Sequence, residues 1–161
     1  MITLHKERTF RQTPGVHFAD IGVPGSNGID LVEHTGKSIS PPDKLGLHQF
    51  YVHAHQTDNN RVIKGHRLFE LFYAHWEDPY WFVMLDDKSG ALEIPPGCFH
   101  RSYSGHEGSL LLNHAVRDAQ YDETKEFNPQ IIYGHLFHQP KYHGCTKQQA
   151  KNFIEFGVLS P

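Results

Sequence analysis

The sequence predicts an all-β protein whose many short strands close into a barrel or a sandwich. Three observations support this. Apolar and polar residues alternate from about residue 16 to residue 133, turn-forming residues separate the alternating stretches, and no sustained helical period occurs before residue 140. Alternation with a period of two places apolar side chains on one face of a strand. Many short strands at such spacing are typical of barrels and sandwiches.

Nine alternating segments are the predicted strands. They cover residues 16–23, 28–34, 48–55, 60–64, 67–74, 80–86, 91–95, 109–116 and 130–137. Segments rich in Gly, Pro, Asn and Asp lie between them, such as PGSNG at 24–28 and PPG at 95–97. These residue types favour turns, which supports the division into separate strands.

One helix is predicted near the end of the chain, over about residues 146–156. Thr146 can cap its first turn, and Gln149, three residues later, can complete a capping box. Gly157 suits the end of the helix. A narrow apolar stripe at helical spacing is formed by Ala150, Phe153 and Ile154. We expect this helix to cover the outside of the barrel or to contact a partner subunit.

The composition favours a single cytoplasmic domain that binds a small molecule. With 161 residues the chain can form one core, and we expect one domain over residues 1–161 with a barrel core at about 16–135. The formal net charge of −3 offers no basic field for nucleic acid or an anionic membrane. No apolar run has transmembrane length, and the N-terminal segment does not resemble a signal peptide. Cys98 and Cys145 form no CxxC pair.

Two histidine-bearing stretches are the candidate site. The segment HQFYVHAH contains His48, His53 and His55, and in a continuous strand the last two share one face. Two imidazoles on one face of a barrel strand can meet at a single point inside. The second stretch, GALEIPPGCFHRSYS at residues 90–104, passes through a tight turn to His100. We therefore expect the imidazoles of His53, His55 and His100 to converge on a common point.

Together these stretches resemble the two motifs of the cupin superfamily. The first cupin motif has HxH, an acid a few residues later and a glycine beyond it; here it is matched by His53, His55 and Gly65. The second has glycine, a short apolar run, PxG and a histidine; here it is matched by Gly90, Pro95, Gly97 and His100. The resemblance covers roughly residues 46–117 and implies a jelly-roll barrel, the double-stranded β-helix of cupins.

The resemblance implies a divalent metal, Zn²⁺, Fe²⁺ or Mn²⁺, on His53, His55 and His100, since imidazole suits all three ions. The sequence departs from the family where a metal cupin usually has glutamate, because that region reads Gln56, Asp58, Asn59 and Asn60. Asp58 can replace the glutamate only if the turn bends it inward. The alternative is a metal-free pocket lined by hydrogen-bonded histidines.

Within the superfamily the sequence is similar to two classes of enzyme that act on nucleotide-linked keto-sugars. LGLHQ at 45–49 and NRVIKG at 60–65 resemble the dTDP-4-dehydrorhamnose 3,5-epimerases, and VHAHQ at 52–56 and AQYDETKEF at 119–127 resemble the dTDP-sugar 3,4-ketoisomerases. The first likeness implies that His48 occupies the position of the catalytic base. A neutral imidazole can remove the proton that a keto group acidifies.

The same likeness is incomplete. Leu45 stands where the epimerases have an arginine, and Leu112, Asn113 and His114 stand where their acid tyrosine is expected. Strand alternation also places His48 on the face opposite His53 and His55, so that only one of these sets can line the lumen.

The candidate residues fall into two groups. Catalytic candidates are His53, His55 and His48, and substrate-binding candidates are Tyr51, Gln56, Arg61, His100, Arg101 and His114. Arginine suits an oxyanion or a phosphate because its fork binds two oxygens, although Arg61 and Arg101 can equally lie on the solvated outer face.

Three functions stay open. The first is an isomerase or epimerase of a free or nucleotide-linked keto-sugar, and the second is a metal-dependent cupin of another class, such as a dioxygenase or lyase. The third is a non-catalytic cupin that binds a small molecule. We also expect a homodimer that pairs through the edge of strand 16–23 or 28–34, because pairing removes exposed backbone groups.

Overall fold

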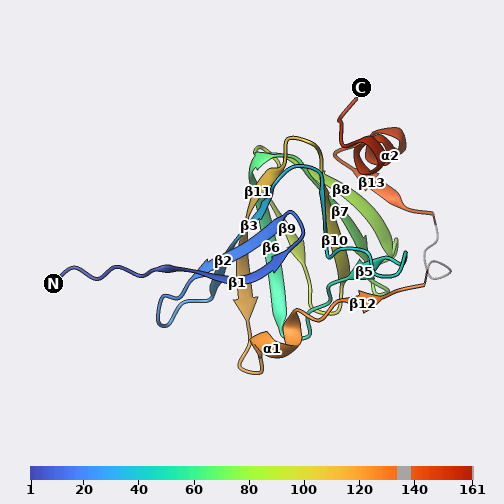
Figure 1. Cartoon of the computed structure of the whole chain (residues 1–161). Helices are drawn as coiled ribbons and strands as arrows, with labels where there is room; N and C mark the ends of the chain where they lie inside the picture. Colours follow the sequence, from blue (N-terminus) through green and yellow to red (C-terminus); the bar gives the residue numbers. More distant parts are fainter. Residues whose placement is uncertain (134–138, 161) are drawn as a thin grey trace.

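Alternating apolar and polar residues form two β-sheets that face each other across an apolar interior (Figure 1). The computed structural model describes residues 1–133 and 139–160. Within these residues the first sheet has six strands, and each neighbouring pair is antiparallel. Their spatial order is β1 (Glu7–Thr13), β2 (Val16–Ile21), β3 (Gly28–His34), β11 (Ser109–Arg117), β6 (Gln56–Gly65) and β9 (Ala91–Ile94).

The second sheet has five strands within the described residues. Their order is β13 (Lys141–His143), β8 (Tyr80–Leu85), β7 (Arg67–Phe72), β10 (Phe99–Ser104) and β4 (Ser38–Ser40). All neighbours are antiparallel except β13 and β8, which run parallel. A separate short pair joins β5 (Gln49–Phe50) to β12 (Gln130–Ile131). The predicted all-β jelly roll is therefore confirmed.

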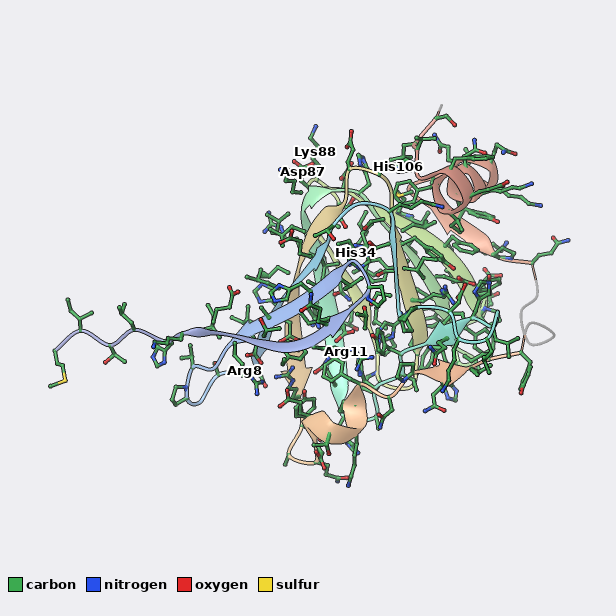
Figure 2. The ribbon with its side chains drawn as sticks, in the orientation of Figure 1. Arg8, Arg11, His34, Asp87, Lys88 and His106 are labelled. Atoms are coloured by element: carbon green, nitrogen blue, oxygen red, sulfur yellow. The ribbon has the colours of Figure 1, made fainter. Side chains whose placement is uncertain are left out.

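The core lies between the two sheets, where the inward side chains of both meet. Its buried members include Val32, Val62, Phe69, Leu71, Val83, Ile94 and Leu111. Polar residues replace apolar ones at one end of this interior, next to the short helix α1 (Glu123–Glu126). The loops that carry Asp87, Lys88 and His106 lie at the opposite end (Figure 2).

The predicted C-terminal helix is confirmed as α2 (Lys147–Phe156). Thr146 caps it, a capping box with Gln149 is present, and Gly157 ends it with a left-handed φ of 71°. Ala150 and Phe153 of α2 pack on the outer face of the second sheet, against the buried residues Leu68, Met84 and Tyr103.

The predicted strand at 48–55 is wrong. Only Gln49 and Phe50 belong to a strand, Tyr51 exchanges two backbone hydrogen bonds with His100, and the chain bends at Ala54 and His55. The strand β6 then begins at Gln56. This bend changes which side chains face the interior.

The alternation rule also missed four strands, β1, β4, β10 and β13. In β10, the sequence FHRSYS is polar on both faces, so that no period of two is visible. Of the predicted strand 130–137, residues 130 and 131 form β12, whereas 134–137 lie outside the described residues, as does the predicted end of the barrel core at 135. Among the described residues no helix is long and apolar enough to cross a membrane.

The homodimer remains a prediction, but the edge expected to pair is now that of β1 and not of β2 or β3. The strands β2 and β3 are paired on both sides, whereas β1 is the edge strand of the first sheet. The preceding segment, residues 1–6, extends away from the sheets and exposes Met1, Ile2 and Leu4 (Figure 1). We expect light scattering at micromolar concentration to give about twice the 18.5 kDa chain mass. A mass of one chain would contradict pairing through this edge.

Candidate functional site

A polar cavity opens between the sheets at the α1 end of the barrel. Within it, the centre of a water-sized molecule can occupy about 50 Å³. Both sheets line it, and its polar lining residues are Asp30, Ser40, Tyr51, His53, Gln56, Asp58, Asn60, Arg67, His100, Ser102 and Asn113. Its apolar walls include Phe18, Phe69 and Phe127. Polar groups that converge in a cavity lined by aromatic side chains are typical of a small-molecule site.

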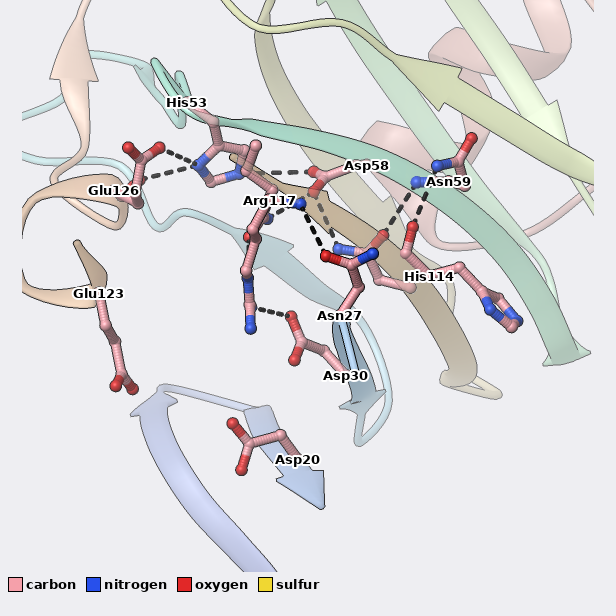
Figure 3. Close-up of polar contacts among 12 residues, drawn as sticks. Asp20, Asn27, Asp30, His53, Asp58, Asn59, His114, Arg117, Glu123 and Glu126 are labelled. Carbon is pink, nitrogen blue, oxygen red and sulfur yellow. Dashed lines mark hydrogen bonds and ion pairs between the residues drawn. The ribbon is translucent and has the colours of Figure 1, made fainter. Parts of the chain in front are cut away.

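Two imidazoles meet one carboxylate in the lining of this cavity. His53 precedes the bend, Asp58 points inward from β6, and His100 points inward from β10. Nε2 of His53 and Nε2 of His100 each lie 3.4 Å from Oδ2 of Asp58. All three side chains are buried. Figure 3 shows His53 between Asp58 and Glu126.

Backbone carbonyls fix the orientation of both rings. Nδ1 of His53 donates to the carbonyl of Glu126 at 2.9 Å, and Nδ1 of His100 donates to the carbonyl of Cys98 at 3.1 Å. A carbonyl oxygen can only accept, so Nδ1 of each ring carries a proton. The Nε2 atoms are then the ones available to Asp58 or to a metal ion.

Neighbouring charges set the protonation of this cluster. Burial raises the pKa of Asp58, but the imidazoles and the amide of Asn113 outweigh it and hold that pKa below its ordinary value. Burial lowers the pKa of His53, but Asp58 outweighs it and the pKa is raised. Burial and the neighbouring His53 lower the pKa of His100 to about 4. The cluster thus pairs the carboxylate of Asp58 with a neutral imidazole, His100, and with an imidazole whose affinity for a proton is increased, His53.

The second oxygen of Asp58 is held by two amides. Oδ1 accepts hydrogen bonds from Nε2 of Gln56 at 2.6 Å and from Nδ2 of Asn113 at 2.9 Å. Gln56 is itself held by Arg117, whose Nε donates to Oε1 at 2.8 Å. These bonds orient the carboxylate so that Oδ2 faces the two Nε2 atoms.

Glu126 shapes the bend that separates His53 from His55. Its buried Oε2 accepts from the backbone N–H of Ala54 at 3.0 Å and of His55 at 3.4 Å. The bend turns His55 out of the cavity, where its Nδ1 lies 2.9 Å from Oδ2 of Asp118. The prediction that His53, His55 and His100 converge, and that they bind the metal, is therefore wrong for His55. Asp58 takes the place expected for His55.

The other sequence-predicted residues are dispersed. Tyr51 and Gln56 line the cavity. His48 lies on the surface, with Nδ1 2.9 Å from Oδ1 of Asp43, so the structure does not bring it to the lumen as the epimerase-like arrangement requires. Arg101 is fully buried on the outer face of the second sheet, where it also contacts Asp43.

Arg61 and His114 are exposed on the outer face of the first sheet. The ring of His114 points away from His53 and Asp58 (Figure 3). The prediction that His114 lines the cavity is therefore wrong. Its neighbour Asn113 faces inward instead, and successive residues of a strand point to opposite faces. Neither side chain borders the cavity.

Sequence reasoning did not single out several residues of the site, namely Asp30, Arg67, Asn113, Arg117 and Glu126. For Asp30 a signal existed, since it alternates with Val32 and His34 and so shares their inward face in a predicted strand. For Glu126 no signal existed, because its role depends on a bend more than seventy residues earlier.

Asp30 is a buried carboxyl group beside the metal-binding candidates. Its Oδ2 lies 3.3 Å from Nη2 of Arg117 (Figure 3), whereas its buried Oδ1 has no hydrogen-bond partner among the described residues. Burial raises the pKa of Asp30 to about 7, although Arg117 opposes the shift. A carboxyl group with this pKa can both give and take a proton near neutral pH.

We expect Asp30→Asn to flatten the pH dependence of stability. The folded carboxyl keeps its proton up to about pH 7, whereas the unfolded one releases it near 3.8, so the folded state binds more protons between these values. Wild-type stability should therefore fall as pH rises through this window, by roughly 4 kcal/mol from this group. Urea unfolding at several pH values measures it. The control Glu33→Gln, on the exposed face of β3, should keep the wild-type slope, and an unchanged slope in Asp30→Asn would contradict the assignment.

Comparison with known proteins finds similarity in structure alone. No protein-family model matches the sequence, and no curated protein matches it. A variant of oxalate decarboxylase from B. subtilis superposes with a TM-score of 0.55 and 12% identity, over 82% of this chain and 34% of that chain. The capsular polysaccharide assembling protein CapF from Staphylococcus aureus gives 0.59 and 9%, over 80% and 32%. A domain of Drosophila melanogaster CENP-C gives 0.50 and 14%, over 66% and 70%.

These similar structures are cupin-fold proteins. The chain spans about a third of the length of the oxalate decarboxylase and CapF chains. At such identities the likeness concerns the architecture, and it agrees with the two facing sheets. The protein therefore has the cupin fold.

Proposed function

We propose that the protein is a metal-dependent enzyme that moves a proton at a carbon atom next to a carbonyl group, as an isomerase or epimerase of a small sugar-like substrate. The observation that carries this proposal is the convergence of two Nε2 atoms on Oδ2 of Asp58, with both Nδ1 atoms fixed by backbone carbonyls. The cupin fold hosts many functions, so the geometry of the site, and not the fold, supports this reaction.

The three side chains fit a divalent metal. Two imidazoles and one carboxylate are the ligand set typical of Fe²⁺ sites with open positions, and Zn²⁺ and Mn²⁺ accept the same donors. Ligand atoms about 2.1 Å from one ion lie roughly 3.0–3.4 Å apart in octahedral or tetrahedral geometry. The separation of 3.4 Å between each Nε2 and Oδ2 matches this range, and all three ligand atoms lie within 4.8 Å of one another.

A bound metal would supply Lewis-acid polarisation of a substrate carbonyl or hydroxyl group. The chain itself supplies the other requirements. Gln56 and Asn113 orient the carboxylate of Asp58, and Phe127 walls the cavity beside His53. Asp30 offers a free Oδ1 that can take the proton from carbon and return it to the neighbouring carbon on the same face.

Solvent exchange tests this proposal. We expect the metal-loaded protein in D₂O to exchange the carbon-bound proton next to the carbonyl of a compound from a panel of aldoses, ketoses and keto acids, followed by proton NMR. Asp30→Asn should slow the exchange by about 10²–10⁴-fold with its metal content unchanged, because it removes the general base. Binding of a compound without exchange would instead indicate a non-catalytic binding protein.

A second candidate is an iron-dependent oxygenase, because two histidines and one carboxylate are also the ligands of that class. Oxygen consumption by the Fe²⁺-loaded protein with the same panel would favour it. Full exchange activity with Zn²⁺, which has no redox chemistry, would favour the isomerase.

A further inference from the structure

The deep end of the cavity contains a buried cation, Arg67, the first residue of β7. It is 1% exposed and lines the same cavity as the metal-binding candidates. Its Nε donates to Oγ of Ser109 at 2.7 Å, and its Nη2 donates to the carbonyls of Val32 at 3.1 Å and Ser109 at 3.4 Å. Among the described residues no carboxylate forms an ion pair with it.

The hydrogen bonds of Arg67 leave one nitrogen available. A guanidinium group has five N–H donors, and the three bonds above use those of Nε and Nη2. Nη1 makes none of the hydrogen bonds found within the described residues. Burial lowers the pKa of Arg67 to about 9, in keeping with a charge that no carboxylate of the described residues offsets. A buried cation of this kind is stabilised by an anion that enters the cavity.

Two further polar side chains lie between Arg67 and the metal-binding candidates. Asn60 is two residues beyond Asp58 on β6, and Ser102 is two residues beyond His100 on β10. Both are buried and line the cavity. Within the described parts of the chain, neither side chain has a hydrogen-bond partner of its own.

Strand register places these groups in successive layers. His100 pairs with Leu71 and Ser102 pairs with Phe69, so Ser102 is one inward step deeper than His100. Arg67 is the next inward residue of β7 after Phe69. The inward residues of β7 from Leu71 to Arg67 span about 13 Å at about 3.3 Å per residue. The three layers therefore follow one another along the barrel axis, from the metal-binding candidates to Arg67.

We propose that Nη1 of Arg67 binds a carboxylate of the substrate, while Asn60 and Ser102 bind its hydroxyl groups, so that the substrate is a small hydroxy or keto acid. This proposal names the substrate class of the proposed function. It depends on that function for the reaction of the acid, whereas binding of the carboxylate by Arg67 does not depend on it. A carboxylate fits better than a phosphate. The single positive charge of Arg67 balances a monoanion, whereas a dianionic phosphate would keep one buried negative charge without a partner. A neutral sugar would leave the cation without a partner.

Binding of lactate and of its neutral isostere lactamide tests the proposal directly. Calorimetric titration of the full chain, once after EDTA treatment and once loaded with Zn²⁺, separates the carboxylate site from the metal. We expect lactate to bind in both states and lactamide to bind at least about tenfold more weakly in the metal-free state. Equal affinity for the two compounds, or no binding of lactate in either state, would overturn the proposal.

Variants then locate the carboxylate. Arg67→Gln should weaken lactate binding by about 10–100-fold, whereas Lys64→Gln, which removes a positive charge on the exposed face of β6, should leave it unchanged. Asn60→Ala and Ser102→Ala keep Arg67 and should weaken lactate binding by about 2–10-fold, which keeps the test decisive if Arg67→Gln does not fold. Wild-type affinity in a folded Arg67→Gln protein, or in both alanine variants, would overturn the assignment.

The two proposals can fail separately. Lactate binding without metal binding in any preparation would refute the metal-dependent function and leave the carboxylate site. Metal binding without discrimination between lactate and lactamide would refute the carboxylate site and leave the metal centre.

Discussion

Asp58→Asn is expected to lower the affinity for Zn²⁺ by at least about 100-fold. The substitution keeps the size of the side chain but removes the only carboxylate that faces both Nε2 atoms within the described residues. Loss of an outer-shell partner alone costs about 10–100-fold in metal affinity, so loss of an anionic ligand should exceed that range. Competition against a chromophoric chelator measures the affinity.

The matched control is Asp118→Asn, which removes the exposed carboxylate beside His55. It should leave Zn²⁺ affinity unchanged, because the bend directs His55 and Asp118 away from the cavity. An equal loss in both variants, or wild-type affinity in Asp58→Asn, would contradict the assignment of the metal ligands.

Glu126→Ala is expected to have the second-largest effect, through the bend rather than through direct contact with a metal. Without Oε2, the N–H groups of Ala54 and His55 lose their acceptor, which should lower the free energy of unfolding by about 2–4 kcal/mol. The backbone carbonyl that accepts from Nδ1 of His53 remains, but the loosened bend would shift the backbone that carries His53, so Zn²⁺ affinity should fall by about 10–100-fold. Urea unfolding and chelator competition measure the two effects.

Two controls separate the bend from a general loss of stability. Glu126→Gln keeps an acceptor oxygen and should recover most of both effects, and Glu123→Ala, on the exposed side of the same short helix, should leave Zn²⁺ affinity unchanged. Zn²⁺ affinity equal to wild type in folded Glu126→Ala would show that the bend does not position His53.

Much of the fold follows from local patterns. The strand β3 spans the predicted residues 28–34, and α2 carries the predicted cap, stripe and terminating glycine. Both elements are specified by residues within a few positions of one another, through alternation or through capping. The resemblance to the cupin motifs also identified His53 and His100, because each stands next to a turn encoded nearby.

The remaining features of the site depend on contacts that no local pattern contains. A run of eight residues from His48 to His55 looks like one strand, but Glu126 imposes a bend from far along the chain. That bend excludes His55 and brings Asp58 inward, the alternative that sequence analysis left open. Arg67 is the first residue of an apolar strand, a position at which a charged side chain is usually solvated. Its burial comes from Ser109 and other residues of the opposite sheet, which are distant in the sequence.

His53, Asp58 and His100 are expected to hold one divalent metal. Anomalous diffraction at the zinc absorption edge, from crystals of the protein loaded with Zn²⁺, tests it most directly. We predict one anomalous peak about 2.0–2.2 Å from Nε2 of His53, Nε2 of His100 and Oδ2 of Asp58. A peak bound by His55 in place of Asp58, or no peak between the two sheets at saturating Zn²⁺, would contradict the account.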